Sequence, residues 1–373
     1  KWRAHPDDVL PMFIAEMDFA LAPAVREALA EAVAAGDTGY IHGPDRSAFA
    51  AFADFAADRW GWRPDPARME RSADVGVVIV ETLRRVIEPG DGVIIMPPVY
   101  PPFWPNTEEA GGRVVEVPFV ATDDGRGHRM DLAGVERALA SGEARAVLLC
   151  NPHNPVGRVY RPDELAAMAE LCLARGAIIV ADEIHCDFVY DGRRHTPIAT
   201  LSPEVEARTI TLLAPSKTFN VAGLCCSVAI IPDPALRKAF CGARRGLVPE
   251  VNVLGMVAAL AAYRDGQPWL DEVLRYLQAN RDWLARAVAE ALPGVTMALP
   301  EGTYLAWLDC RALALSESPG EFLLREARVA LNDGAGFGRG GEGFARLNYG
   351  CCRSLLEEAV ERMARVLERV GIA

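Results

Sequence analysis

Short apolar runs alternate with helical patterns through the middle of this chain, and this alternation limits the fold more than any other feature. Helices are expected at 23–35, 77–88 and 163–175. Pro162 and Gly176, which flank the last of these, are typical of the start and the end of a helix. Strands that alternate with helices predict an α/β fold, in which helices cover both faces of a mostly parallel sheet. The apolar runs that predict its strands are 92–96, 114–117, 146–150, 177–181, 209–213 and 227–231.

The character of the sequence changes after about residue 250, where long helical patterns replace the short apolar runs. Near the C-terminus, Ser354-Leu355-Leu356-Glu357 has the pattern of a capping box and predicts the start of a final helix. The chain has 373 residues, more than one domain usually holds. We therefore expect a large α/β domain over 41–265 and a smaller α+β domain over 1–40 and 266–373.

Composition and charge exclude several classes of protein. The formal net charge of −12 disfavours a surface for nucleic acid or an anionic membrane. No run of about 18 apolar residues is present for a transmembrane helix, and the start at Lys1 is typical of a trimmed chain and not of a signal peptide. The nine cysteines and six histidines lack the spacing of a metal site. We expect reduced thiols and a cytoplasmic location, without a metal, nucleic-acid or membrane partner.

Three polar residues stand at the ends of separate apolar runs and carry the strongest chemical signal. Asn154 lies in a Pro/Gly-punctuated loop after one run, Asp182 directly follows a second run, and Lys217 comes shortly after a third. The carboxyl ends of parallel strands are where α/β sheets bind ligands. An amine, an acid and an amide at this edge are what pyridoxal phosphate (PLP) chemistry requires.

Each of these residues has an expected role. Lys217 forms the Schiff base with the cofactor and, once freed by the substrate, removes the substrate's α-proton as general base. Asp182 keeps the pyridine nitrogen protonated, so that the ring withdraws electrons, and the amide of Asn154 donates to the ring oxygen O3′. His185 contacts the ring or its oxygen. The alternatives are a surface position for Lys217, a helix cap for Asp182 and a simple turn around Asn154. For His185 the alternative is a core or surface histidine.

Other residues are expected to contact the cofactor. Gly76-Val77-Val78 opens a helix, and backbone N–H groups at such a start, here those of Val77 and Val78, bind phosphate. Tyr100 lies among prolines and is expected to stack on the ring, with core packing as the alternative. Ser216, directly before the lysine, is also expected to contact the cofactor.

Two features of the C-terminal third bear on the substrate. Arg346 is expected to clamp the substrate carboxylate bidentately. Arg353 competes for this role, although its position before the final helix favours a surface or capping role. The glycine-rich stretch 334–341 is expected to be mobile. It lacks the strand and helix of a dinucleotide fingerprint, so we reject that interpretation. Whether it closes over the substrate stays open.

The motifs around these residues resemble the PLP-dependent fold-type-I superfamily of aspartate aminotransferase, and most of all its bacterial cystathionine β-lyase (C–S lyase) branch within aminotransferase class I/II. The resemblance implies an aspartate-aminotransferase-like large domain, a smaller domain, and a homodimer with active sites at the subunit interface. It carries over the roles given above and adds Tyr40, which would reach the phosphate of the neighbouring subunit's cofactor. The matching segments are 15–19, 39–40, 97–103, 151–157, 182–185, 216–224 and 346–348.

Three positions distinguish this chain from much of the superfamily. His185 stands where a tyrosine is common, and histidine is what we expect in the C–S lyase branch. Ala214 stands where relatives usually have a serine or threonine on the phosphate. Cys225 replaces the phosphate-binding arginine of aspartate aminotransferase. The resemblance therefore implies that cofactor affinity depends more on backbone amides and on Tyr40, and it favours a lyase.

The leading hypothesis is a PLP-dependent C–S β-lyase that cleaves L-cystathionine or a related cysteine S-conjugate to pyruvate, ammonia and a thiol. The alternative is an aminotransferase that acts on an L-amino acid and a 2-oxo acid and shares the early steps. A third hypothesis is a catalytically silent binding module, against which the intact set of Lys217, Asp182 and Asn154 argues. The sequence leaves the physiological substrate and the pathway open.

Overall fold

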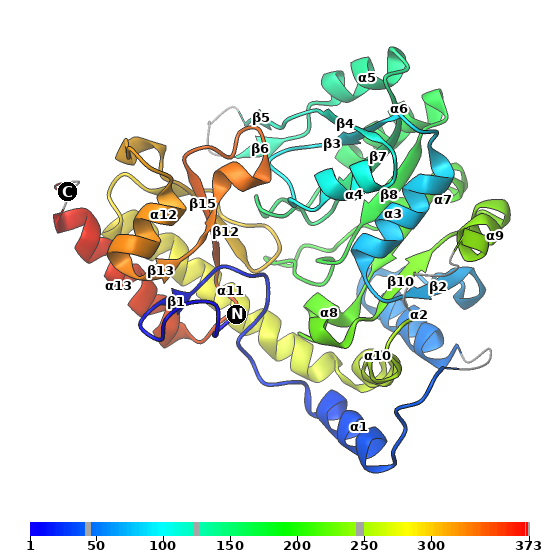
Figure 1. Ribbon diagram of the computed structural model, residues 1–373, viewed down its shortest axis with the longest axis horizontal. Helices are drawn as coiled ribbons and strands as arrows, with labels where there is room; N and C mark the ends of the chain where they lie inside the picture. The colour runs from blue at the N-terminus through cyan, green and yellow to red at the C-terminus, as the bar shows by residue number, and fades with distance from the viewer. Residues whose placement is uncertain (42–45, 123–126, 244–249, 370, 372–373) are drawn as a thin grey trace.

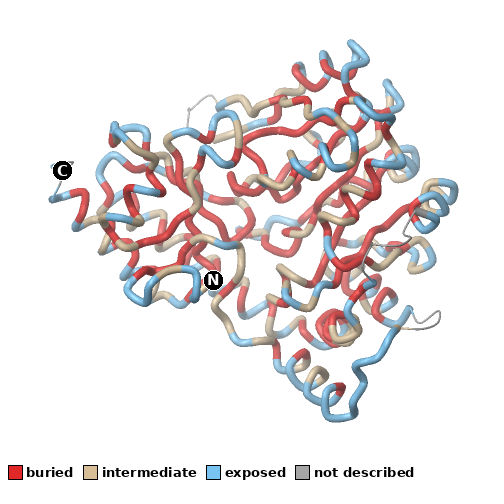
Figure 2. The backbone as a smooth tube through the Cα atoms, viewed as in Figure 1, coloured by how far each residue is buried: buried red, intermediate tan, exposed pale blue. Residues whose placement is uncertain are grey.

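Two sheets organise the protein in this computed structural model, which describes residues 1–41, 46–122, 127–243, 250–369 and 371. The larger sheet lies on the right in Figure 1 and the smaller one on the left. Figure 2 shows that buried backbone is concentrated in the strands of both sheets and in the helices next to them.

The large sheet has seven strands and confirms the predicted α/β fold. Five neighbouring strands run parallel, while β10 is antiparallel to both of its neighbours. Strands such as Thr209–Leu213 are buried along their whole length, as expected where helices cover both faces. The spatial order is β2 (Met69–Ser72), β10 (Ser227–Ile230), β9 (Thr209–Leu213), β8 (Ile178–Asp182), β7 (Ala144–Cys150), β3 (Gly92–Ile95) and β4 (Arg113–Glu116).

Helices pack against both faces of this sheet. One face is covered by α3 (Val75–Val86), α4 (Phe103–Glu109) and α9 (Pro234–Ala243). The other face is covered by α5 (Leu132–Ala140), α6 (Pro162–Arg175) and α7 (Pro203–Ala207). At the β10 end a further cluster joins α1 (Pro23–Ala34), α2 (Ser47–Trp60) and α10 (Val253–Asp265). A short hairpin pairs β5 (Val120–Ala121) with β6 (His128–Arg129).

The smaller sheet is built from the C-terminal third. Its four strands are β11 (Thr296–Met297), β12 (Leu305–Asp309), β15 (Phe344–Asn348) and β14 (Asn332–Asp333), in that order. The helices of this part are α11 (Gln267–Ala291), α12 (Pro319–Phe322) and α13 (Arg353–Arg369). The N-terminal strand β1 (Leu10–Pro11) pairs in parallel with β13 (Val329–Ala330), so the start of the chain joins the core of this part.

The predicted domain division at residues 40 and 265 stays a prediction. In Figure 1 the blue N-terminal segment leaves β1 and reaches α1, which lies beside α10. Val25 of α1 belongs to the same apolar cluster as Ala258 of α10. This packing favours a boundary before α1, with residues 10–19 on the side of the small sheet.

Local sequence signals explain where several helices begin and end. Helix α6 begins at Pro162 and ends at Gly176, whose φ of +66° suits a residue without a Cβ. The predicted capping box at Ser354 is wrong, because α13 begins at Arg353 and Ser354 lies inside its first turn. The glycine-rich stretch 334–341 forms a 3-10 turn followed by a tight loop, in which a Cβ at Gly338 would meet Trp104 at 2.4 Å.

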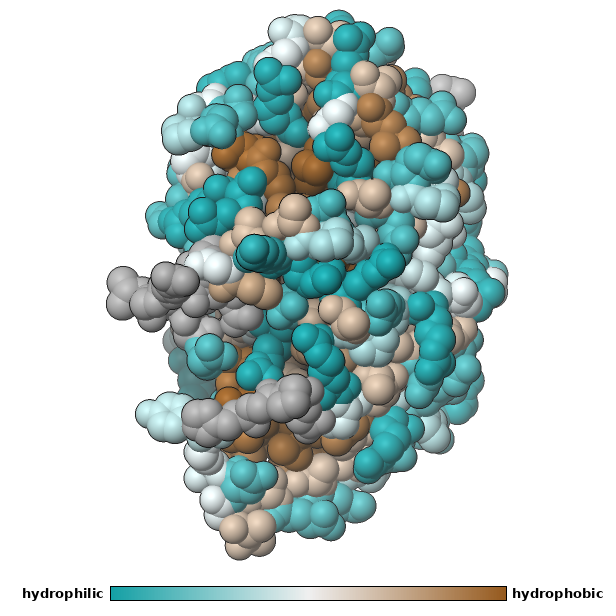
Figure 3. Space-filling model, turned by 90° about the vertical axis from the view of Figure 1, so that its right-hand side faces the viewer, coloured by the Kyte–Doolittle hydropathy of each residue, from teal (hydrophilic) through white to brown (hydrophobic). Residues whose placement is uncertain are grey.

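On the face drawn in Figure 3, hydrophilic side chains cover much of the surface and apolar side chains gather in a few patches between them. Within the part of the chain that the structure describes, no helix combines the length and apolarity that a membrane crossing requires.

Candidate active site

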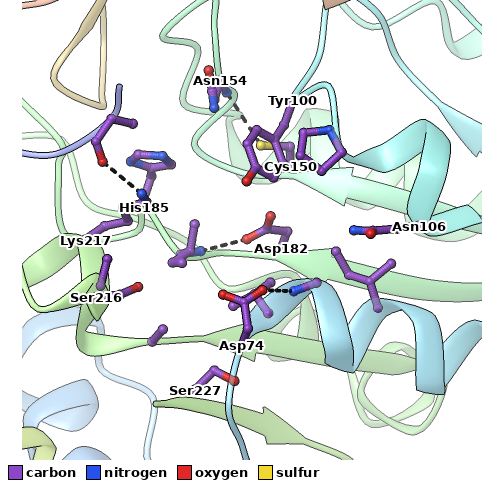
Figure 4. A pocket seen from close by; sticks show the side chains of 18 of the residues that line it. Asp74, Tyr100, Asn106, Cys150, Asn154, Asp182, His185, Ser216, Lys217 and Ser227 are labelled. Carbon is purple, nitrogen blue, oxygen red and sulfur yellow. Dashed lines mark hydrogen bonds between the residues drawn. The ribbon is translucent and has the colours of Figure 1, made fainter. Parts of the chain in front are cut away.

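A cavity of about 310 Å³ lies where β7, β8 and β9 of the large sheet end. Figure 4 shows the side chains that surround it. Six of the sequence-predicted site residues line this cavity together, namely Tyr100, Asn154, Asp182, His185, Ser216 and Lys217. The ends of separate strands therefore bring these groups to one cavity, while their roles stay predictions.

Lys217 lies on α8 (Pro215–Thr218), a short helical turn that follows β9. Its Nζ donates a hydrogen bond to the backbone carbonyl of Ala15 at 2.8 Å. Burial, with Arg346 nearby, lowers the pKa of the Lys217 amine below its usual range. A lowered pKa increases the fraction of neutral amine, which is the form that attacks a carbonyl carbon or accepts a proton.

Asp182 is the last residue of β8, and its side chain is buried. One carboxylate oxygen accepts a hydrogen bond from the backbone N–H of Ile184 at 3.2 Å. Burial raises the pKa of this carboxyl to about 7. A cationic ring N–H beside it would favour the ionised form again, so the site fits a pyridinium nitrogen.

His185 presents a buried nitrogen to this region. Its Nδ1 has no hydrogen-bond partner among the described residues, and its ring packs edge-on against Tyr304 with centroids 5.7 Å apart. Burial lowers the pKa of His185 to about 3, so the ring is neutral near pH 7. A buried polar atom of this kind needs a hydrogen-bond partner, and its place in the cavity fits a polar substituent of the cofactor.

Asn154 and Arg346 form a pair at the edge of the cavity. Nη1 of Arg346 donates to Oδ1 of Asn154 at 2.9 Å, and Nη2 donates to Oδ1 of Asn332 at 2.6 Å. Because the oxygen of the Asn154 amide is engaged, its NH₂ group is the donor that fits the ring oxygen. Nε of Arg346 has no partner among the described residues, which suits an arginine that receives a substrate carboxylate.

Arg346 does not line the cavity itself and reaches it through Asn154. Its guanidinium lies 4.9 Å from the centroid of Phe337, and burial lowers the pKa of Arg346 to about 10, so it stays charged. Its competitor Arg353 stands at the start of α13. There its Nε donates to Asn280 at 3.0 Å, which agrees with the structural role favoured for it.

The predicted phosphate contacts change, because α3 begins at Val75 and Asp74 is its N-cap. The N–H of Val78 donates to the carbonyl of Asp74 at 3.2 Å, so this amide closes the first turn and does not serve a ligand. Neither Val77 nor Val78 lines the cavity, whereas Gly76 does. The contact predicted for Val78 is therefore wrong. The amides of Val75 and Val77 lie in the first turn, where the helix itself supplies no acceptor, and remain as candidates.

Two predicted tyrosines stand in different settings. Tyr100 lines the cavity and is 39% exposed, and its ring centroid lies 5.9 Å from that of Phe103. Partial burial raises the pKa of its hydroxyl to about 12. Tyr40 is 90% exposed and lies outside the cavity of its own subunit. Its contact with a neighbouring subunit's cofactor stays a prediction.

Residues 14–18, which we call the strap, cross the site from the N-terminal segment. Asn220 holds Met17 by accepting from its N–H at 2.9 Å and donating to its carbonyl at 2.7 Å. Asn348 donates to the carbonyls of residues 14 and 16 at 2.6 and 2.7 Å. The hydroxyl of Tyr304 donates to the Ala15 carbonyl at 2.9 Å, the same oxygen that Lys217 contacts.

Sequence reasoning missed the role of the strap. Residues 15–19 and Asn220 belong to the motifs that carry the family resemblance, and that was the signal that could have found them. It also missed Asp74 and Ser227, which line the cavity. Asp74 stands between Ala73 and Val75, and Ser227 is the first residue of a predicted strand, so neither position carried a pattern that pointed to a site.

Comparison with known proteins agrees with this geometry. A family model described as aminotransferase class I and II matches residues 7–363. Cystathionine beta-lyase PatB of Bacillus subtilis is 37% identical over 96% of this chain and 93% of that protein. Cystathionine beta-lyase of Corynebacterium glutamicum is 36% identical over 98% and 96% of the two chains.

A solved structure shows the same likeness in three dimensions. Cystalysin from Treponema denticola, whose structure contains pyridoxal 5'-phosphate, is 30% identical with a TM-score of 0.93, over 99% of this chain and 93% of that one. The family match covers nearly the whole chain, and the cavity offers an amine, a carboxylate and an amide to the cofactor. The protein therefore belongs to the class I and II aminotransferase family of PLP-dependent enzymes.

Proposed function

We propose that this protein is a PLP-dependent C–S β-lyase, which cleaves L-cystathionine or a related cysteine S-conjugate to pyruvate, ammonia and a thiol. The observation that carries the proposal is the gathering of Lys217, Asp182 and Asn154 around one cavity. The relatives from Bacillus subtilis and Corynebacterium glutamicum are named cystathionine beta-lyase, which favours this branch of the family. The presence of a histidine at position 185, which the family resemblance leads us to expect in the C–S lyase branch, supports the same branch.

The binding steps follow from charge and hydrogen bonding. The guanidinium of Arg346 receives the α-carboxylate of the substrate, with its Nε–H as the available donor. Two of its other N–H groups are fixed by Asn154 and Asn332, so the group is oriented before the substrate binds. Asp182 and Asn154 hold the cofactor ring at its nitrogen and its oxygen.

Proton transfer falls to Lys217. Bound PLP supplies the carbonyl that joins the substrate amine and the ring that takes up the electron pair of the α-carbon. The freed amine of Lys217, held by the Ala15 carbonyl, removes the α-proton. The electron pair then expels the thiolate from the β-carbon, and the ammonium of Lys217 passes the α-proton to the sulfur, which leaves as a thiol. The released enamine takes up water and gives pyruvate and ammonia, which completes the balance.

An aminotransferase is the second candidate, because the family model carries that description and the residues named above serve its first half as well. The two reactions separate only after the α-proton is removed. In an aminotransferase a proton returns to the cofactor carbon, whereas in a lyase the β-substituent leaves.

The test is to mix the PLP-loaded protein with L-cystathionine in the absence of any 2-oxo acid. We expect steady pyruvate formation with an equal amount of free thiol, and loss of both in Lys217→Ala. A single turnover that ends with the cofactor in its pyridoxamine form, without pyruvate, would instead identify an aminotransferase.

We further infer that two copies form a homodimer, in which Tyr40 of one copy reaches the cofactor of the other. The strongly exposed Tyr40 supports this inference, since a large aromatic side chain on a surface is typical of an interface. We also infer a reducing compartment, the cytoplasm, because six cysteines are buried as free thiols among the described residues, for example Cys150 and Cys172.

A further inference from the structure

The end of the cavity next to α3 holds a carboxylate. Asp74 is the N-cap of α3, and its Oδ1 accepts a hydrogen bond from the N–H of Gly76 at 2.7 Å. The side chain lines the same cavity as Lys217 and Asp182. Figure 4 shows Asp74 beside the start of the helix, between Asp182 and Ser227. Because α3 presents its N-terminus here, this end is where backbone amides would hold the cofactor's phosphate.

Asp74 already does part of what a phosphate would do at this helix end. The first turn of α3 has amides that lack partners within the helix, and these are the donors that an anion uses. The carboxylate of Asp74 occupies the amide of Gly76 and places a negative charge at the positive end of the helix. An incoming phosphate must therefore compete for that N–H and approach a like charge.

Little in the cavity offsets this charge. Among the described residues that line it, Lys217 is the sole lysine or arginine, whereas Asp74 and Asp182 are both acidic. Lys217 is committed to the cofactor's carbonyl carbon, so its charge is not available to the phosphate. Ala214 offers only a methyl group, and the hydroxyl of Ser227 donates to the carbonyl of Ser72 at 3.1 Å. The NH₂ group of Asn106, which has no partner among the described residues, is a donor at this end but carries no charge.

We propose that Asp74 is a negative determinant of cofactor affinity, which opposes the phosphate of PLP while leaving the binding of the ring untouched. The groups that face the ring, Asp182, His185 and Asn154, make no distinction between PLP and its unphosphorylated form, pyridoxal. The wild-type chain therefore gains less affinity from the phosphate than its helix N-terminus allows. The proposal rests on the cofactor assignment and not on the C–S lyase reaction.

The experiment compares wild type with Asp74→Asn in binding PLP and pyridoxal. Asparagine caps a helix as well as aspartate does, so the substitution removes the charge and keeps the cap. Each ligand is titrated into the cofactor-free protein, and binding is followed by the absorbance of the Lys217 adduct. We expect Asp74→Asn to bind PLP about tenfold more tightly, a difference of about 1.4 kcal/mol, and to bind pyridoxal within about twofold of wild type.

A second aspartate in the chain provides a matched control. Asp131 caps α5 through a hydrogen bond from Gly134 at 3.0 Å and does not line the cavity, so Asp131→Asn should change neither affinity. If Asp74→Asn folds poorly, Asp74→Ser retains a capping hydroxyl and tests the same charge.

Two results would overturn the proposal. One is unchanged or weaker PLP binding by both Asp74 variants. The other is an equal gain for PLP and pyridoxal, which would assign the effect to the whole cavity. Because binding is measured directly, either result is independent of whether L-cystathionine is cleaved.

Discussion

Burial of Asp182 lowers the free energy of unfolding of the cofactor-free protein by an amount that depends on pH. Its carboxyl has a folded pKa of about 7, against 3.8 for the unfolded reference. Between these pH values the unfolded chain releases a proton that the folded chain keeps. The free energy of unfolding therefore falls as the pH rises through this window and stays reduced above it.

Asp182→Asn removes this titration. At pH 8 we expect the free energy of unfolding of the cofactor-free variant to exceed that of wild type by roughly a few kcal/mol, and its unfolding temperature to be higher. At pH 4 we expect the two proteins to unfold at similar temperatures. Thermal unfolding at the two pH values measures this. The same difference at both pH values would mean that titration of Asp182 is not the cause.

The same substitution should damage catalysis. Without the carboxylate, the ring nitrogen of the cofactor loses the partner that keeps it protonated, so electron withdrawal weakens. We expect Asp182→Asn to retain PLP and to lose turnover by about 100-fold or more, as when other preorganised electrostatic groups are removed. Turnover near the wild-type rate would refute the assigned role.

Arg346 and Arg353 can be separated by kinetics. Arg346→Ala should raise KM for amino-acid substrates by at least about tenfold and change PLP affinity much less, because the guanidinium faces the substrate carboxylate. Arg353→Ala is the matched control, since its side chain bonds to Asn280 and packs on Trp283. A larger KM effect from Arg353→Ala would exchange the two roles.

At this scale the sequence predicted the reactive groups better than the phosphate contacts. Lys217, Asp182 and Asn154 were predictable because each follows an apolar run, and parallel strands present their ends at one edge. The amide of Val78 was misjudged because the helix was expected to begin at residue 77. Its cap is Asp74, and the pattern of one strand end gave no sign that its side chain would line the cavity.

At the scale of elements, the strap fixes the nitrogen of Lys217 through backbone atoms that Asn220 and Asn348 hold. Asn220→Gly removes the side chain and suits the backbone there, whose φ is +57°. We expect kcat to fall roughly tenfold to 100-fold with little change in KM, because the amine loses its orientation toward the α-proton. Steady-state kinetics with L-cystathionine give both parameters.

A control and a second variant separate positioning from stability. Asn252 caps α10 through a hydrogen bond from Leu254 at 2.9 Å, so Asn252→Ala loses a comparable bond away from the strap and should keep its kcat.

Asn348→Ala loosens the strap that Asn220 also holds. The double variant Asn220→Gly/Asn348→Ala should therefore lose less than the product of the two single effects. A loss equal to the product of the two single effects would show that Asn220 and Asn348 act independently.

Strand positions were predicted within two residues at either end, because buried parallel strands read as continuous apolar runs. The strand β2 was missed, since Met69-Glu70-Arg71-Ser72 carries two charges and lies at the edge of the sheet. The strap was also unpredictable from pattern. It has no periodicity, and its partner Asn220 is 203 residues away from Met17 in the sequence.

At the scale of the whole molecule, the proposed homodimer makes a test by mixing possible. Lys217→Ala copies retain Tyr40, and Tyr40→Ala copies retain Lys217. A mixed dimer therefore contains one intact site if Tyr40 acts across the interface. When the two are co-expressed equally and assayed at limiting PLP, we expect about a quarter of the wild-type activity. Activity equal to the mean of the two separate variants would exclude a shared site.

The strap has a further consequence for protein engineering. Its bonds to Lys217, Tyr304, Asn220 and Asn348 all use main-chain atoms of residues 14–17, and none uses the side chain of Ile14 or Glu16. Side chains at these two positions can therefore vary without releasing the catalytic amine. A directed-evolution library that randomises Ile14 would keep these bonds and the charges of the site, whereas a change at Glu16 would also remove a negative charge that acts on Lys217.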